Sequence, residues 1–318
     1  MPPLIHGVLP ILHTPFTDDD EIDLVTLRRE IDWAFSVGAH GVGTGMVSEV
    51  LRLTEEERLT LNAKMAEFTA GRGAVIASAG AESTKGAIRY AQAAERAGCT
   101  AVMVIPPINA ALPERALWDY FTAIADAIDI PVIVQDASSY VGHAIPVSFY
   151  VRLLDHYSPG KILFKPEASP VGPNLSALRD ASGGRARIFD GSGGMLLVDA
   201  YRRGIAGTMP GTDLLDGIVL LWNALQANDQ SAIDRFAAPI CAIVALQLQA
   251  GLDGFLAIEK YILRKRGLFP TERRRAPFGW QLDDETRSLV DLHLMQLLAA
   301  IEADSPAIGS PQPSQALR

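Results

Sequence analysis

The chain has 318 residues, of which 48% are hydrophobic, so it is long enough to bury the core of one large domain. Its formal net charge is -9 and no basic run exceeds three residues, which argues against nucleic-acid and anionic-membrane partners. Cys99 and Cys241 lack metal-ligand spacing, and no signal-like start or long apolar run is present. These features predict a soluble cytoplasmic protein whose partner is a small molecule.

Short apolar runs rich in Val and Ile alternate eight times with longer amphipathic stretches. The predicted strands are 7–12, 40–45, 74–79, 101–105, 131–135, 161–165, 186–190 and 205–209. The predicted helices between them are 24–37, 55–70, 83–97, 112–128, 146–155, 171–182 and 193–203. This alternation is typical of an α/β (β/α)8 TIM barrel. An open doubly wound sheet is the competing fold, but the Gly-x-Gly-x-x-Gly turn expected after its first strand is absent from the sequence.

The pattern becomes wholly helical after Pro210, over about 211–227, 229–250, 252–266 and 283–302. We therefore predict a barrel at 1–225 and a C-terminal helical extension at 226–303. These helices either extend the barrel or form a subunit interface. The last stretch, 304–318, is polar and rich in Pro and Ser, which predicts a disordered tail.

Active groups of such a barrel lie at the C-terminal ends of the strands, where Lys165 ends the sixth predicted strand. An amine among Ile162, Leu163 and Phe164 loses ammonium solvation, which favours the neutral form that attacks a ketone to give a Schiff base. The alternative is a lysine whose ammonium reaches solvent.

The loop Gly191-Ser192-Gly193-Gly194 indicates a rival class, because glycine-rich backbone after the seventh strand often binds phosphate. A companion cation is expected in that class, and the first one after this loop is Arg202. The histidines lack zinc spacing, and the acidic run 18–21 lacks the spacing of a calcium loop. We predict no metal and no cofactor.

Several motifs occur along the chain in a characteristic order. They are Thr14-Pro15-Phe16, Gly45-Met46-Val47-Ser48-Glu49, Phe164-Lys165, Gly191, Lys260, Gly267 and Arg275-Ala276-Pro277. In this order the chain resembles the dihydrodipicolinate synthase/N-acetylneuraminate lyase family of lysine-dependent pyruvate aldolases and dehydratases. The resemblance implies a (β/α)8 lyase that binds a 2-oxo acid through Lys165. It also implies a homo-oligomer, a tetramer or a dimer.

The chain departs from this family at its proton-relay positions. Met46 and Val47 replace two small hydroxyl residues, although their backbone N–H groups remain available to hold a carboxylate. Ser48 is the nearest hydroxyl, with proton transfer and turn capping as its alternative roles. Gln135 replaces the usual tyrosine, and Ile108 replaces the usual aromatic residue. These changes argue against the aspartate-semialdehyde condensation of the synthases.

The segment Gln135-Asp136-Ala137 and the strand end Phe164-Lys165-x-Glu167 instead resemble the branch that dehydrates 2-keto-3-deoxy sugar acids. In the implied mechanism Lys165 forms an imine, a base removes a C3 proton, and a hydroxyl leaves as water. The candidate bases are Glu167, which shares a strand face with Lys165 if the extended geometry continues, and water held by Gln135 and Ser48. The alternative for Glu167 is a solvated loop glutamate. Tyr140 stands where the synthases have an arginine for their second substrate. It is a candidate acid toward the leaving hydroxyl, or a packing residue.

The predicted function is therefore a Schiff-base-forming lyase, a dehydratase or aldolase of a 2-keto-3-deoxy sugar acid. The predicted catalytic residues are Lys165, Gln135, Ser48, Glu167 and Tyr140, and the predicted substrate-binding residues are Met46, Val47, Gly191, Met209, Ile108 and Asp136. Three alternatives stay open: synthase-type condensation with pyruvate, binding of a 2-oxo acid without turnover, and a phosphosugar-binding barrel.

Overall fold

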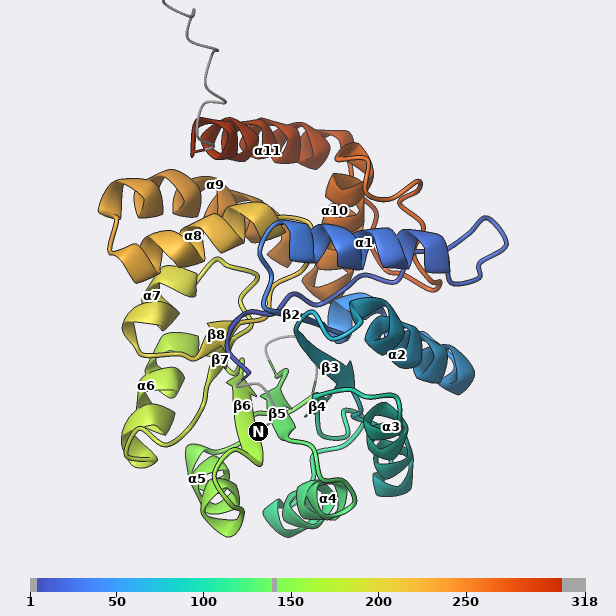
Figure 1. Ribbon diagram of the computed structural model, residues 1–318, viewed down its shortest axis with the longest axis vertical. Coiled ribbons are helices and arrows are strands. Elements are labelled where there is room, and N and C mark those ends of the chain that lie inside the picture. Colours follow the sequence, from blue (N-terminus) through green and yellow to red (C-terminus); the bar gives the residue numbers. More distant parts are fainter. Residues whose placement is uncertain (1–4, 139–141, 305–318) are drawn as a thin grey trace, which may run out of the picture.

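The computed structural model describes residues 5–138 and 142–304, in which a ring of helices surrounds eight short parallel strands (Figure 1). The strands are β1 (Gly7–Val8), β2 (Gly41–Gly43), β3 (Ala74–Ser78), β4 (Ala101–Val104), β5 (Val132–Asp136), β6 (Ile162–Pro166), β7 (Phe189–Asp190) and β8 (Gly207–Thr208). Each strand overlaps the range predicted for it. The architecture is thus the (β/α)8 barrel that the alternating pattern indicates.

Parallel pairing follows the order of the chain around the ring. One sheet runs β2-β3-β4-β5-β6 and the other runs β1-β8-β7. The bridges Ile11–Gly43 and Phe164–Ile188 join the two sheets and complete the barrel. In the pairing of β5 with β6, Gln135 lies directly opposite Lys165. This register brings two of the predicted site residues together at the carboxyl ends of neighbouring strands.

The helices also follow the predicted order. They are α1 (Leu24–Ser36), α2 (Glu55–Thr69), α3 (Thr84–Arg96), α4 (Glu114–Asp126), α5 (Val147–His156), α6 (Val171–Ala181), α7 (Leu197–Arg202), α8 (Leu215–Ala227), α9 (Gln230–Leu248), α10 (Gly251–Lys265) and α11 (Asp284–Asp304), with a short 3-10 helix η1 at Met46–Ser48. Capping explains sharp starts such as that of α2, where Thr54 and Glu57 form a reciprocal capping box.

One predicted helix, 193–203, is too long at its start. Gly193 and Gly194 have φ values of 66° and 99°, which lie outside the right-handed helical region, so α7 begins at Leu197. The glycines pack against apolar side chains instead, including Ile240 and Val244 of α9. The loop after β7 therefore turns beneath the C-terminal helices before the short helix forms.

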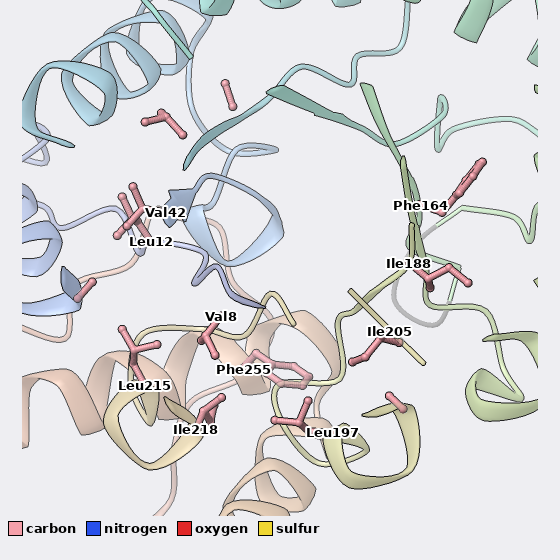
Figure 2. Close-up of a cluster of buried hydrophobic side chains, with 14 of the residues drawn as sticks. Val8, Leu12, Val42, Phe164, Ile188, Leu197, Ile205, Leu215, Ile218 and Phe255 are labelled. Atoms are coloured by element: carbon pink, nitrogen blue, oxygen red, sulfur yellow. The ribbon is translucent and has the colours of Figure 1, made fainter. Parts of the chain in front are cut away.

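The main core lies between the strands and the inner faces of the helices (Figure 2). Val8 and Phe164 from the strand layer are buried in the same cluster as Leu215, Ile218 and Phe255 from α8 and α10. Burying each such side chain contributes about 1.5–3 kcal/mol. A second cluster fills the barrel interior and consists mainly of strand residues such as Ile76, Met103, Ile133, Leu163 and Phe189. The barrel is thus a packed core, and its open space lies at the strand ends.

Helices α8 to α11 lie together at one side of the barrel (Figure 1). Helix α9 packs against α8, α10 and α11. Among the described residues, α9 is the helix that is long and apolar enough to pass for a membrane span. Its Phe236, Ile240 and Val244 are buried in the main core, as in the core helix of a globular domain. The C-terminal helices therefore extend the barrel. The tail predicted at 304–318 lies outside the described residues, apart from Asp304.

Candidate active site

The ends of β5 and β6 bring a lysine, a glutamate and a glutamine into contact. Lys165 Nζ lies 3.3 Å from Glu167 Oε1, and Gln135 Nε2 donates a hydrogen bond of 2.6 Å to Glu167 Oε2. The backbone N–H of Glu167 donates to the carbonyl of Asp136 at 2.9 Å, so pairing continues beyond Pro166. Because extended geometry persists, residues two apart share a face and Glu167 reaches Lys165.

Burial governs the electrostatics of this group. It raises the pKa of Glu167, against the opposing effects of the Lys165 charge and the Gln135 hydrogen bond. Burial also raises the pKa of Asp190 at the end of β7, whose carboxylate accepts hydrogen bonds from Ser192 and Thr208. A carboxylate with a raised pKa is a stronger base, so Glu167 has the property that proton removal needs.

A cavity opens at the carboxyl ends of the strands. Seven of the predicted site residues line it: Met46, Val47, Gln135, Lys165, Glu167, Gly191 and Met209. The barrel therefore gathers residues from β5 and β6 and from the segments that follow β2, β7 and β8 around one space. The cavity lining combines apolar side chains with a few polar groups, as is usual for sites that bind small molecules.

Gly191 leaves room for the lysine and the glutamate. A Cβ placed on this residue would lie 2.2 Å from Glu167 Oε1 and 2.6 Å from Lys165 Cε. Both distances are far below van der Waals contact. A larger residue here would displace the side chains of Lys165 and Glu167. This steric limit explains why a glycine occupies position 191.

Three predicted residues lie elsewhere. Ser48 is buried, and its hydroxyl donates to the Leu12 carbonyl and accepts from the backbone N–H of Gly45, so its contacts are those of a turn cap. Asp136 binds the backbone N–H groups of Ser138 and Ile145 and thereby holds the loop after β5. Neither residue lines the cavity with Lys165.

Ile108 also lies away from the cavity. It packs against the small apolar cluster of Met46, Ile105 and Ala137, of which Met46 lines the cavity. Tyr140, the candidate acid, falls outside the described residues.

The C-terminal helix α10 supplies a wall that the sequence did not suggest. Leu252, Phe255 and Glu259, spaced by three and four residues, share one face of α10 and line the cavity. The sequence contained one indication of this wall, because Glu259 follows the apolar residues Leu256, Ala257 and Ile258. A carboxylate in such a buried stretch is usually paired with another group or has a functional role. Among the described residues, no cluster of three or more His, Cys, Asp and Glu side chains is arranged to hold a metal ion.

Comparison with known proteins decides the family. The model of the dihydrodipicolinate synthetase family matches residues 4–171, which is more than half of the 318 residues. The chain belongs to the dihydrodipicolinate synthetase family. It is accordingly a lyase of this family, and the resemblance noted in its motifs is confirmed.

Two relatives by sequence carry different names. The L-2-keto-3-deoxyarabonate dehydratase of Azospirillum brasilense is 28% identical over 292 residues, covering 90% of this chain and 92% of that enzyme. The 4-hydroxy-tetrahydrodipicolinate synthase of Exiguobacterium sibiricum is 34% identical over 182 residues, covering 57% of this chain and 56% of that enzyme. The chain thus matches the dehydratase over nearly its full length and the synthase over somewhat more than half.

Solved structures agree with the fold. Dihydrodipicolinate synthase from Rhodopseudomonas palustris is 26% identical with a TM-score of 0.80, covering 92% of this chain and 97% of that one. A family member from E. coli K12, a prophage protein crystallised with pyruvate, is 22% identical with a TM-score of 0.84, covering 93% and 99%. These likenesses confirm the (β/α)8 barrel and its C-terminal helices.

Proposed function

We propose that this lyase forms a Schiff base between Lys165 and a 2-oxo acid and removes water from a 2-keto-3-deoxy sugar acid. The observation that carries the proposal is the placement of Lys165 and Glu167 at 3.3 Å on the wall of one cavity. A lysine supplies the nucleophile for imine formation, and a buried carboxylate beside it supplies the base.

The proposed reaction begins when the Lys165 amine attacks the C2 carbonyl and water is lost to give an iminium. Glu167 then takes a proton from C3, and the C3–H electron pair forms the enamine. The enamine nitrogen returns its electrons, the C4–O bond breaks, and the hydroxyl leaves as water after receiving a proton. Hydrolysis of the remaining iminium releases the new 2-oxo acid and restores the amine.

The residues around the lysine support water loss over synthase-type condensation. The Gln135 amide does not gain or lose a proton near neutral pH, so it cannot act as an acid or a base. It holds Glu167 instead, through its 2.6 Å hydrogen bond. Met46 and Val47, which line the cavity, offer backbone N–H groups for the substrate carboxylate but no hydroxyl for a relay. The near full-length match to a named keto-deoxy-sugar-acid dehydratase points the same way.

The glycine-rich loop after β7 gives little support to a phosphosugar substrate. Its hydroxyl, Ser192 Oγ, donates to the buried carboxylate of Asp190 and accepts from the backbone N–H of Leu196. The Glu167 carboxylate also lies close to Gly191. Two carboxylates beside the loop would repel a phosphate dianion.

A homo-oligomer, a tetramer or a dimer, is part of the proposal. On α11, Leu289, Leu292 and Met295 are 46%, 43% and 63% exposed and are spaced by three residues. Such a stripe on the outermost helix is suited to burial against a second copy. Light scattering coupled to size exclusion measures the mass, and a monomer of 34.2 kDa at micromolar concentration would contradict this part.

The deciding experiment is borohydride trapping with pyruvate and with a panel of 2-keto-3-deoxy sugar acids, followed by peptide mass mapping. We expect a reduced adduct on Lys165, and release of a new 2-oxo acid from the compound that traps best. An adduct without any product over hours would indicate a binding protein. Folded protein that gives no adduct with any of these acids would contradict the Schiff-base assignment.

A further inference from the structure

The cavity has a second ionisable wall, formed by Glu259 of α10. Glu259 Oε2 lies 2.7 Å from His13 Nε2, and both side chains are buried. Glu259 Oε1 lies over Gly211, where a Cβ would be 2.6 Å away, and Gly211 lines the same cavity. One oxygen of Glu259 thus binds the histidine, while the other lies at the cavity wall.

The hydrogen bonds around His13 fix its protonation. Thr212 Oγ1 donates its proton to Glu30 Oε1 at 2.5 Å, so it acts as an acceptor toward His13 Nδ1 at 2.8 Å. Glu259 is an acceptor for Nε2. Both ring nitrogens therefore donate, which requires the imidazolium form. His13 follows β1, and its Nε2 donates to the carboxylate of Glu259 on α10.

The charges of the surrounding carboxylates raise the pKa values of His13 and Asp213. Burial opposes the charge on His13, but Glu259 and Glu30 outweigh it and raise its pKa to about 10. Burial and the nearby charge of Glu259 raise the pKa of Asp213 to about 7. A Cβ on Gly211 would contact both Glu259 Oε1 and Asp213 Oδ1, so these two carboxylates crowd one site.

We propose that Glu259 is a second catalytic residue, the general acid that protonates the departing C4 hydroxyl, with His13 as the positioning residue that supplies its proton. This inference rests on the proposed dehydration. As the enamine electrons form the C3=C4 bond, the C4–O pair goes to oxygen. The proton comes from the His13 imidazolium: Nε2 passes it to the Glu259 carboxylate, and the carboxylic acid so formed gives it to the departing oxygen. Water then leaves, His13 is neutral and Glu259 is again ionised.

The separate base and acid roles follow from the positions of the two carboxylates on different walls of the cavity. Glu167, on the β6 side beside Lys165, becomes protonated when it removes the C3 hydrogen. Glu259, on the α10 side, belongs to a separate hydrogen-bonded cluster. Removal of the C3 proton is thereby assigned to Glu167, and protonation of the C4 hydroxyl is assigned to Glu259. General acid assistance of this kind contributes typically about 10²–10⁴-fold in rate.

The test compares Glu259→Gln with the unaltered protein on two substrates that differ in the leaving group. One is the 2-keto-3-deoxy acid that best traps Lys165, and the other is its 4-chloro analogue, from which chloride leaves without a proton. We expect Glu259→Gln to slow water loss about 10²-fold or more, and to slow chloride release less than about 10-fold. Borohydride trapping on Lys165 should be unchanged.

Glu285→Gln, at an exposed position on α11, is the control for loss of a carboxylate and should slow neither reaction. Equal slowing of water loss and chloride release by Glu259→Gln would overturn the proposal, because a structural role does not distinguish leaving groups. Undiminished water loss would overturn it too. Absence of any Lys165 adduct in the unaltered protein would instead contradict the proposed function itself, so the two failures are distinguishable.

Discussion

Lys165 and Lys260 are both buried beside a glutamate, yet their surroundings differ. Lys260 Nζ donates to the carbonyls of Thr14 and Arg273, each at 2.7 Å, and to the carboxylate of Glu49. It also lies 4.6 Å from the centre of the Phe16 ring. All three ammonium protons are used, and the side chain is fully buried. Lys165 instead pairs with Glu167 at the wall of a cavity.

The comparison shows that burial of an amine does not by itself indicate chemistry. Burial lowers the pKa of Lys260, against the opposing charge of Glu49, yet a substrate has no access to it. Lys260 ties α10 to the segments after β1 and β2. Lys165 combines partial desolvation with an adjoining space. We therefore expect access to a cavity, in addition to desolvation, to distinguish the proposed nucleophile from a structural lysine.

The largest expected effect is that of Lys165→Ala. It removes the proposed nucleophile, so turnover should fall by on the order of 10⁴ or more and borohydride should trap no adduct. The barrel should remain folded, because the apolar neighbours stay in place and Glu167 keeps its hydrogen bond from Gln135. Product assays and adduct mass measure this, with the exposed Lys85→Ala as control. Ordinary turnover by the Lys165→Ala protein would show that Lys165 is not the nucleophile, and the contrast with Lys260 would then have no functional meaning.

Lys260→Met should act on stability. It leaves the buried Glu49 carboxylate without its cation, so the free energy of unfolding should fall by about 3–5 kcal/mol, as measured by urea denaturation. Adding Glu49→Gln removes the stranded charge and should recover part of that loss. Loss of the Lys165 adduct in folded Lys260→Met protein would show instead that the two lysines are functionally linked.

Glu167→Gln should separate imine formation from proton removal. The amide retains a hydrogen-bonding side chain but cannot accept the C3 proton, so turnover should slow about 10²-fold while Lys165 is still trapped. Exchange of the C3 hydrogens of bound pyruvate for deuterium, followed by NMR, reports this step directly. Exchange at the ordinary rate would exclude Glu167 as the base.

The smallest effect concerns pH. The pKa of His13 is raised from 6.5 to about 10, so above pH 6.5 the unfolded chain loses a proton that the folded protein keeps. The stabilisation is therefore complete below pH 6.5 and is lost as the pH rises through about 10. The melting temperature should decline by a few degrees across this window, and less so in His13→Asn. His143→Asn, at an exposed position, should keep the unaltered slope.

The fold could be predicted because the sequence pattern of each strand and helix lies within a short stretch of the chain. Strand and helix patterns depend on neighbours a few residues apart, and the exceptions, such as the late start of α7 at Leu197, arise from backbone angles that glycine permits. The contact of Lys165 with Glu167 was predictable for the same reason, since it needs two residues on one strand face.

The rest of the site depends on distant contacts. His13 and Glu259 are separated by 246 positions in the chain, and no local pattern pairs them. Ser48 and Asp136 follow strands and carry suitable groups, but backbone partners in their own loops occupy them. Sequence position identified the rim of the barrel. It did not reveal which polar groups at that rim satisfy the backbone and which face the cavity.

Helix α10 gives the cavity a wall that is independent of the eight strands. Lys165 and Glu167 belong to the barrel sheet, whereas Leu252, Phe255 and Glu259 come from one continuous stretch of 15 residues. We therefore expect substitutions of the apolar residues Leu252 and Phe255 to change which acids the cavity admits while leaving Lys165 and Glu167 in place. One helical face thus offers a route to altered preference that does not disturb the strand ends.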